Sequence, residues 1–99
     1  MTTERTQIRV LCIDDHPLLR QGIGALVGAQ ADMALVAQAA TGQEGIREFR
    51  ETRPDVTLLD LRLPDMSGVE VLRHVKETDP SVPVIRSLSE LHGLLTLHG

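Results

Sequence analysis

The sequence predicts an α/β domain built on a parallel β-sheet. Short apolar runs of strand length alternate with segments that have helical periodicity, in the order β-α-β-α-β-α-β. The apolar runs are nearly continuous, which is typical of strands buried on both faces of a parallel sheet. Such a sheet is joined by right-handed crossovers. The 99 residues suffice for one domain with a modest core.

The first part of the chain predicts a strand, a helix and a second strand. Residues 8–13 form an apolar run rich in β-branched side chains, which predicts the first strand. Pro17 suits the first turn of a helix, and apolar residues at helical spacing extend that helix over 17–29. The run 33–40 predicts the second strand. The helix therefore crosses from one strand to the next.

The middle of the chain predicts a second helix over 43–52. It follows a turn signal at Thr41 and Gly42, and we expect Ile46 and Phe49 to face the core. The Arg-Pro-Asp sequence after Thr52 ends this helix, because proline disfavours helical backbone in the residue before it.

The remaining elements follow the same alternation. Residues 56–61 predict the third strand, and a loop containing proline and glycine follows it. Apolar residues at helical spacing from Val69 predict a third helix that ends near Asp79 and Pro80. Residues 82–85 predict the fourth strand. The glycines at 22, 24 and 28 lie inside the first helix, where they indicate close packing and not a dinucleotide-binding turn.

Composition excludes several classes of function. The formal charge of −4 does not suggest nucleic-acid binding by this chain, and no apolar run is long enough to span a bilayer. The polar N-terminus lacks the apolar core of a signal peptide, so we expect a cytoplasmic protein. The single cysteine, Cys12, fits a reducing compartment and is expected to be a buried thiol.

Three carboxylates are predicted to meet at one edge of the sheet. Asp14 and Asp15 stand at the carboxyl end of the first strand, and Asp60 stands at the carboxyl end of the third. In open parallel sheets ligands bind beyond these strand ends. Clustered carboxylates repel one another unless a cation is present, and Mg²⁺ prefers such oxygen ligands. Asp60 stands alone and is therefore the expected acceptor in phosphoryl transfer.

A purely structural interpretation of each acid is also open. Asp15 has a position from which it can cap the first helix, and Asp65 has a position typical of turn residues. The adjacent pair, the single acid and the Pro-Asp-x-x-Gly loop together favour the metal site over these separate roles.

Three stretches of the sequence resemble the response-regulator receiver domain of two-component signalling. They are IRVLCIDDHPLLRQGI, AATGQEGI and PDVTLLDLRLPDMSGVEVL, in the order and spacing of that family. The first stretch is similar to regulators of the LuxR/NarL type, which carry a helix-turn-helix output domain. The resemblance implies a CheY-like, flavodoxin-like doubly wound sheet with strand order 2-1-3-4-5.

The resemblance also implies roles for individual residues. Asp60 would accept a phosphoryl group from a sensor histidine kinase, with Mg²⁺ held by Asp14, Asp15, Asp60 and the backbone carbonyl of Arg62. Pro64 and Gly68 would shape the loop beside the acceptor. His16 would lie at the rim of the site and not on the metal.

The sequence departs from the family pattern near residue 85. We expect an incomplete receiver over 1–86 and a divergent tail over 87–99, whose leucines have the spacing of one short helix. In the family pattern, the residue whose hydroxyl binds the phosphoryl group corresponds to Leu88 here, which has no hydroxyl. The neighbouring residues Ser87 and Ser89 both stay open for that role. The family's phosphate-binding lysine has no counterpart, because Lys76 on the third helix is the only lysine. The chain looks like a truncated or frame-shifted transcription regulator without its DNA-binding domain.

Two functions follow from these observations. The first is a phosphoacceptor, which is not a multiple-turnover enzyme. The second is a non-signalling fragment or phosphate-independent interaction module that keeps the acidic pocket. A Mg²⁺-dependent phosphatase is the weaker alternative, because such enzymes place Asp-x-Asp after the first strand and here the acids are adjacent. Besides the kinase, a second copy is an expected partner, through the open edge of the fourth strand.

Overall fold

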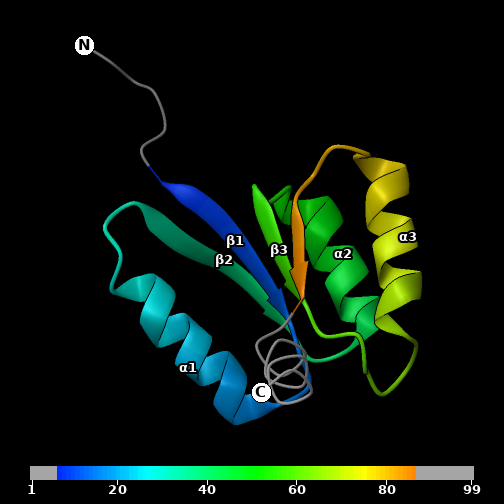
Figure 1. The fold of residues 1–99 in the computed structure, drawn as a ribbon, viewed down its shortest axis with the longest axis horizontal. Helices are drawn as coiled ribbons and strands as arrows, with labels where there is room; N and C mark the ends of the chain where they lie inside the picture. Colours follow the sequence, from blue (N-terminus) through cyan, green and yellow to red (C-terminus); the bar gives the residue numbers. More distant parts are fainter. Residues whose placement is uncertain (1–6, 87–99) are drawn as a thin grey trace, which may run out of the picture.

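The computed structural model describes residues 7–86, which form one parallel sheet with a helix after each of its first three strands (Figure 1). The strands lie in the order β2-β1-β3-β4. The elements are β1 (Ile8–Ile13), α1 (Pro17–Gly28), β2 (Met33–Ala39), α2 (Gly42–Thr52), β3 (Val56–Leu59), α3 (Gly68–Thr78) and β4 (Val84–Arg86).

The helices cover both faces of the sheet. Helix α1 lies on one face, and α2 and α3 lie side by side on the other (Figure 1). Alternation along β1 divides its side chains between the two faces: Cys12 packs with Ile23 and Val27 of α1, whereas Leu11 and Ile13 pack with the cluster under α2 and α3. This two-sided burial explains why the strands are almost continuously apolar.

Local sequence signals set the helix ends. Thr41 caps α2 by accepting a 3.1 Å hydrogen bond from the backbone N–H of Glu44. Ser67 caps α3 in the same way from Glu70, at 3.2 Å. Helix α2 ends at Thr52, and the C-cap residue Arg53 has a left-handed φ of 49° that turns the chain toward β3.

The predicted fold class is confirmed, and some boundaries differ. The third strand ends at Leu59 and not at 61, because the Leu61 carbonyl turns away to accept a hydrogen bond from the N–H of Gly68. The fourth strand is shifted to Val84–Arg86, since the Val82 carbonyl accepts a hydrogen bond from the Lys76 ammonium at 2.7 Å. The predicted helix of the tail lies outside the described residues.

The side chains expected at the core largely lie there. Phe49 is buried and Ile46 packs against the same cluster, as predicted. The prediction of close packing was wrong for Gly22 and Gly28, because an added Cβ at either position meets no atom of residues 7–86 within 4 Å outside the backbone of its own helix. A Cβ added at Gly24 would lie 3.4 Å from the side chain of Leu35, which is an ordinary van der Waals contact. Among residues 7–86, no helix is long and apolar enough to cross a membrane.

Candidate functional site

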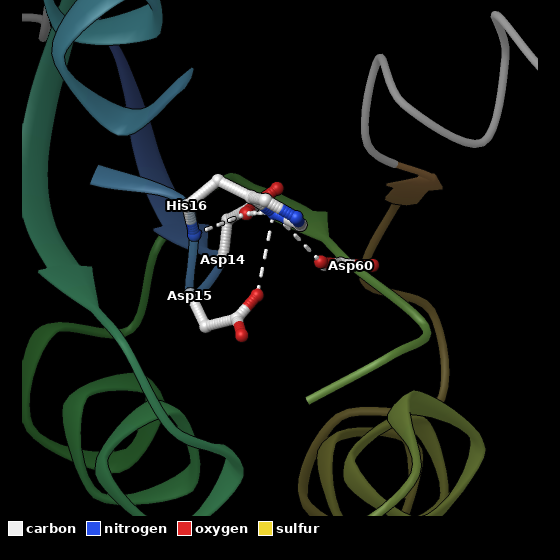
Figure 2. Close-up of side chains that lie close together, drawn as sticks. All are labelled: Asp14, Asp15, His16 and Asp60. Carbon is white, nitrogen blue, oxygen red and sulfur yellow. Dashed lines mark hydrogen bonds and ion pairs between the residues drawn. The ribbon is translucent and has the colours of Figure 1, made fainter. Parts of the chain in front are cut away.

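Three acids gather at the carboxyl ends of β1 and β3 (Figure 2). Ile13 of β1 pairs with Leu59 of β3, so Asp14 and Asp60 leave the sheet at the same level. The N–H of Asp60 donates to the carbonyl of Ile13 at 2.9 Å, which extends the ladder by one further bond. Asp14 and Asp60 are each only 1% exposed, whereas the side chain of Asp15 is 37% exposed. The predicted convergence of these acids is therefore present in the fold.

Each acid keeps one carboxylate oxygen without a hydrogen-bond partner. Asp14 Oδ1 accepts the N–H of His16 at 2.9 Å, and Asp60 Oδ1 accepts the N–H of Arg62 at 3.0 Å. Asp14 Oδ2, Asp60 Oδ2 and Asp15 Oδ1 are buried and have no hydrogen-bond partner among residues 7–86. A buried, charged oxygen without a partner raises the free energy of the folded state, and a bound cation would remove this penalty.

The electrostatics of Asp60 agree with a site built for a cation. Burial raises the pKa of the Asp60 carboxyl, and the negative charges of Asp14 and Asp15 raise it further. The hydrogen bond from the N–H of Arg62 and the nearby His16 oppose this rise. A divalent cation beside these oxygens would favour the ionised carboxylate that nucleophilic chemistry requires.

His16 reaches further into the cluster than the resemblance implied. Its side chain is 57% exposed, which agrees with a place at the rim. Its Nδ1 atom nevertheless lies 2.6 Å from Asp14 Oδ1, 3.3 Å from Asp15 Oδ1 and 3.4 Å from Asp60 Oδ2 (Figure 2). The hydrogen bond to Asp14 is the main reason why the pKa of His16 is raised.

The loop after β3 is held tightly around Gly68. A Cβ at this position would lie 2.5 Å from Leu61 Cα and 2.6 Å from the carbonyl oxygen of Asp60. Only glycine lets α3 begin so close to the acid. Arg62 and Ser67 form an isolated antiparallel bridge across the loop, and Pro64 lies exposed between them. Metal ligation by the Arg62 carbonyl stays a prediction.

Two side chains support the site in ways that sequence reasoning did not predict: Arg20 was not singled out, and Asp65 was interpreted only as a turn residue. The guanidinium of Arg20 donates to the backbone carbonyl of Asp14 at 2.6 Å and so ties α1 to the end of β1. Asp65 accepts hydrogen bonds from the N–H groups of Gly42 and Gln43, at 2.7 and 2.9 Å. Its partners are more than 20 residues away, so only the fold brings them together.

The phosphate-binding lysine of the family has no counterpart among the described residues. Lys76 lies on α3, where its ammonium donates to the Val82 carbonyl. The two open candidates for the hydroxyl, Ser87 and Ser89, lie outside the described residues. Within 7–86 the site consists of three carboxylates, one imidazole and the backbone around them.

A parallel sheet of this strand order, with carboxylates clustered beyond β1 and β3, is the architecture of a signal-receiver domain. The family model described as "Response regulator receiver domain" matches residues 10–90. The chain belongs to this family.

Individual relatives agree with the family. The chain is 38% identical over 78 residues to response regulator protein VraR from Staphylococcus aureus, covering 79% of this chain and 37% of VraR. A LuxR-family two-component response regulator from Aurantimonas sp. SI85-9A1 has a TM-score of 0.75 and 36% identity, over 81% of this chain and 57% of that one. The response regulator domain of Thermotoga maritima CheB has a TM-score of 0.77 and 32% identity, over 81% and 59%. The chain thus spans little more than a third of the length of VraR.

Proposed function

We propose that the chain is a phosphoacceptor in which Asp60 takes a phosphoryl group from the phosphohistidine of a sensor histidine kinase. The observation that carries this proposal is the state of the Asp60 carboxylate. It is 1% exposed, its Oδ1 is held by the N–H of Arg62, and its Oδ2 has no hydrogen-bond partner in the described part of the chain. One oxygen is thus fixed while the other stays available as a nucleophile.

The transfer needs no other nucleophile from the chain. Asp60 Oδ2 forms the new O–P bond while the N–P bond to the kinase histidine breaks, and that histidine leaves with the electron pair. Asp14 is the less suitable acceptor, because its Oδ1 accepts hydrogen bonds from both the backbone and the ring of His16. The product is an acyl phosphate on Asp60, and the chain is not a multiple-turnover enzyme.

The donor set fits Mg²⁺. The three unpartnered oxygens of Asp14, Asp15 and Asp60 are the hard ligands that this ion prefers. We propose that these side chains hold it together with the backbone carbonyl of Arg62. When bound, the ion neutralises the carboxylates and the phosphoryl oxygens during in-line transfer.

We also propose which kind of protein this chain comes from and which partners it has. Similarity to a LuxR-family regulator favours an origin in a cytoplasmic transcription regulator whose DNA-binding part is not among these 99 residues. In this setting the chain itself makes no contact with nucleic acid or membrane, and a second copy pairs through the edge of β4. The domain division at 86 and 87 belongs to the same proposal.

The proposed function is tested by intact-protein mass after incubation with acetyl phosphate. We expect one added phosphoryl group in the presence of Mg²⁺ and none in excess EDTA. Asp60→Asn should abolish the addition. Asp32→Asn is the matched control, because Asp32 is exposed and lies near the start of β1, at the other end of the sheet.

Two results would overturn the proposal. The first is equal phosphorylation of the Asp60→Asn variant, which would assign the group to another residue. The second is no added mass in a chain whose far-ultraviolet circular dichroism shows it to be folded, which would favour the non-signalling module.

A further inference from the structure

The side chain of His16 lies in the acidic cluster instead of capping its own helix. His16 is the N-cap residue of α1, yet its side chain makes no capping hydrogen bond. Its ring turns instead toward Asp14, Asp15 and Asp60, with Nδ1 no more than 3.4 Å from an oxygen of each (Figure 2). The cluster therefore contains a nitrogen donor among its carboxylates.

The spacing of these atoms fits a set of metal ligands. In an octahedral site with bonds of about 2.1 Å, neighbouring ligand atoms lie about 3 Å apart. The separations of 3.3 and 3.4 Å from His16 Nδ1 to Asp15 and Asp60 are close to this value. One ligand atom from each of the four side chains lies within 4.8 Å of all the others.

A second observation points to a ligand at the same place. Within the described ranges, Asp14 Oδ2 and Asp60 Oδ2 are buried and have no hydrogen-bond partner, and their side chains are 1% and 2% exposed. The imidazole does not satisfy these two oxygens with a hydrogen bond. A cation within the cluster satisfies them and also takes the place of the hydrogen that now links His16 Nδ1 to Asp14 Oδ1.

We propose that His16 Nδ1 is a fourth side-chain ligand and that it makes the site prefer a transition-metal ion such as Co²⁺ or Ni²⁺ over Mg²⁺. This inference rests on the carboxylate metal site of the proposed function. Carboxylates alone suit Mg²⁺, whereas imidazole suits ions later in the first transition series. The nitrogen donor thus changes which ion the pocket selects.

The test is isothermal titration calorimetry of Ni²⁺ and Mg²⁺ binding to the full chain. His92 and His98 lie outside the described residues and are replaced by alanine throughout, so that they add no nickel site. In this background His16→Ala should weaken Ni²⁺ binding by about tenfold or more and change Mg²⁺ binding by less than about twofold. His74→Ala is the matched control, because His74 lies on α3, outside the cluster, and should change neither.

Two outcomes would overturn this inference alone. Equal loss of affinity for both ions in His16→Ala would mean that the imidazole acts on the fold and not as a selective ligand. Tighter binding of both ions would mean that the ring competes with the metal.

A different result would implicate the proposed function. If the parent chain and Asp60→Asn bind neither ion, the carboxylate site itself fails, and the selectivity inference fails with it. If Asp60→Asn loses both ions while His16→Ala loses neither, the carboxylate site stands and only the role of His16 is wrong.

Discussion

The carboxylate of Asp65 accepts a 2.7 Å hydrogen bond from the backbone N–H of Gly42, a residue that precedes it by 23 positions. Its second oxygen accepts the N–H of Gln43 at 2.9 Å, so both donors belong to the first turn of α2. The bond ties the loop after Asp60 to the helix that follows β2. The acidic site is thus held by a cap from a distant part of the chain.

Replacement of Asp65 by asparagine should lower the melting temperature at pH 7. The backbone N–H groups of Gly42 and Gln43 lower the pKa of the Asp65 carboxyl, so the folded state favours the charged form. A carboxyl with a lowered pKa stabilises the fold above its unfolded pKa, and this contribution is lost as the pH falls through the folded value.

Urea unfolding of the parent chain and Asp65→Asn checks this at pH 7 and at acidic pH. The difference in free energy of unfolding should shrink as the pH falls below the ordinary carboxyl value of 3.8. Glu77→Gln, at an exposed position on α3, should show no difference at either pH. A difference for Asp65→Asn that does not depend on pH would contradict the charged cap.

Two glycine-to-alanine variants should change stability in opposite directions. Gly68→Ala forces a Cβ to within 2.6 Å of the backbone of Asp60 and Leu61, so we expect a loss of about 1–3 kcal/mol. Gly22→Ala places its Cβ in open space within α1, so we expect a gain of about 0.5–1 kcal/mol. Chemical denaturation of both variants measures these changes. Similar effects at both positions would show that helix propensity and not contact with the acid-bearing loop decides the outcome.

The thiol of Cys12 should be almost unreactive in the native protein. Cys12 is 1% exposed, and burial together with the charge of Asp14 raises the pKa of its thiol to about 11. The reactive thiolate is therefore scarce at neutral pH, and the reagent cannot reach the sulfur without opening of β1. Since Cys12 is the only cysteine, the labelling rate with a chromogenic disulfide reports on this strand alone. Labelling in native buffer as fast as in concentrated urea would argue against a folded core.

The acidic cluster should destabilise the metal-free chain. Because the pKa of Asp60 is raised, the folded state binds its proton more tightly, and the free energy of unfolding falls as the pH rises from the unfolded value toward the folded one. Asp60→Asn should therefore melt at a higher temperature than the parent chain in EDTA.

Addition of divalent cation should reverse this order. A ligand at 100 times its dissociation constant stabilises the folded state by about 2.7 kcal/mol, and we expect this gain in the parent chain and a smaller one in Asp60→Asn. Thermal melts in EDTA and in Mg²⁺ measure both effects. A parent chain that is more stable than Asp60→Asn without metal would indicate that the cluster is satisfied by the protein alone.

The fold was predictable because each strand carries its own signal. Apolar residues on both faces of β1 and β3 indicated a parallel sheet, and the helices between them followed from periodicity. The exact ends of the strands and helices were harder to predict from the sequence. Strand β4 begins later than predicted because the carbonyl of Val82 accepts a hydrogen bond from the ammonium of Lys76. This is a tertiary contact that no local sequence pattern indicates.

The site was predictable in part for a related reason. Asp14 and Asp60 follow strands directly, so the sheet fixes where they meet. The rotation of the His16 ring into the cluster depends on a side-chain torsion, and the cap by Asp65 depends on the approach of two loops. Neither has a signature in the sequence, because both depend on contacts formed only after the chain has folded.

The most direct test of the central claim is to locate the phosphorylated residue. Borohydride reduces an aspartyl phosphate to homoserine, and fragmentation of the resulting peptides identifies the altered position. After incubation of the full chain with acetyl phosphate and Mg²⁺, we predict homoserine at Asp60 and none at Asp14 or Asp15. Homoserine at either of those two residues, or a phosphoryl group retained on a histidine, would contradict the account.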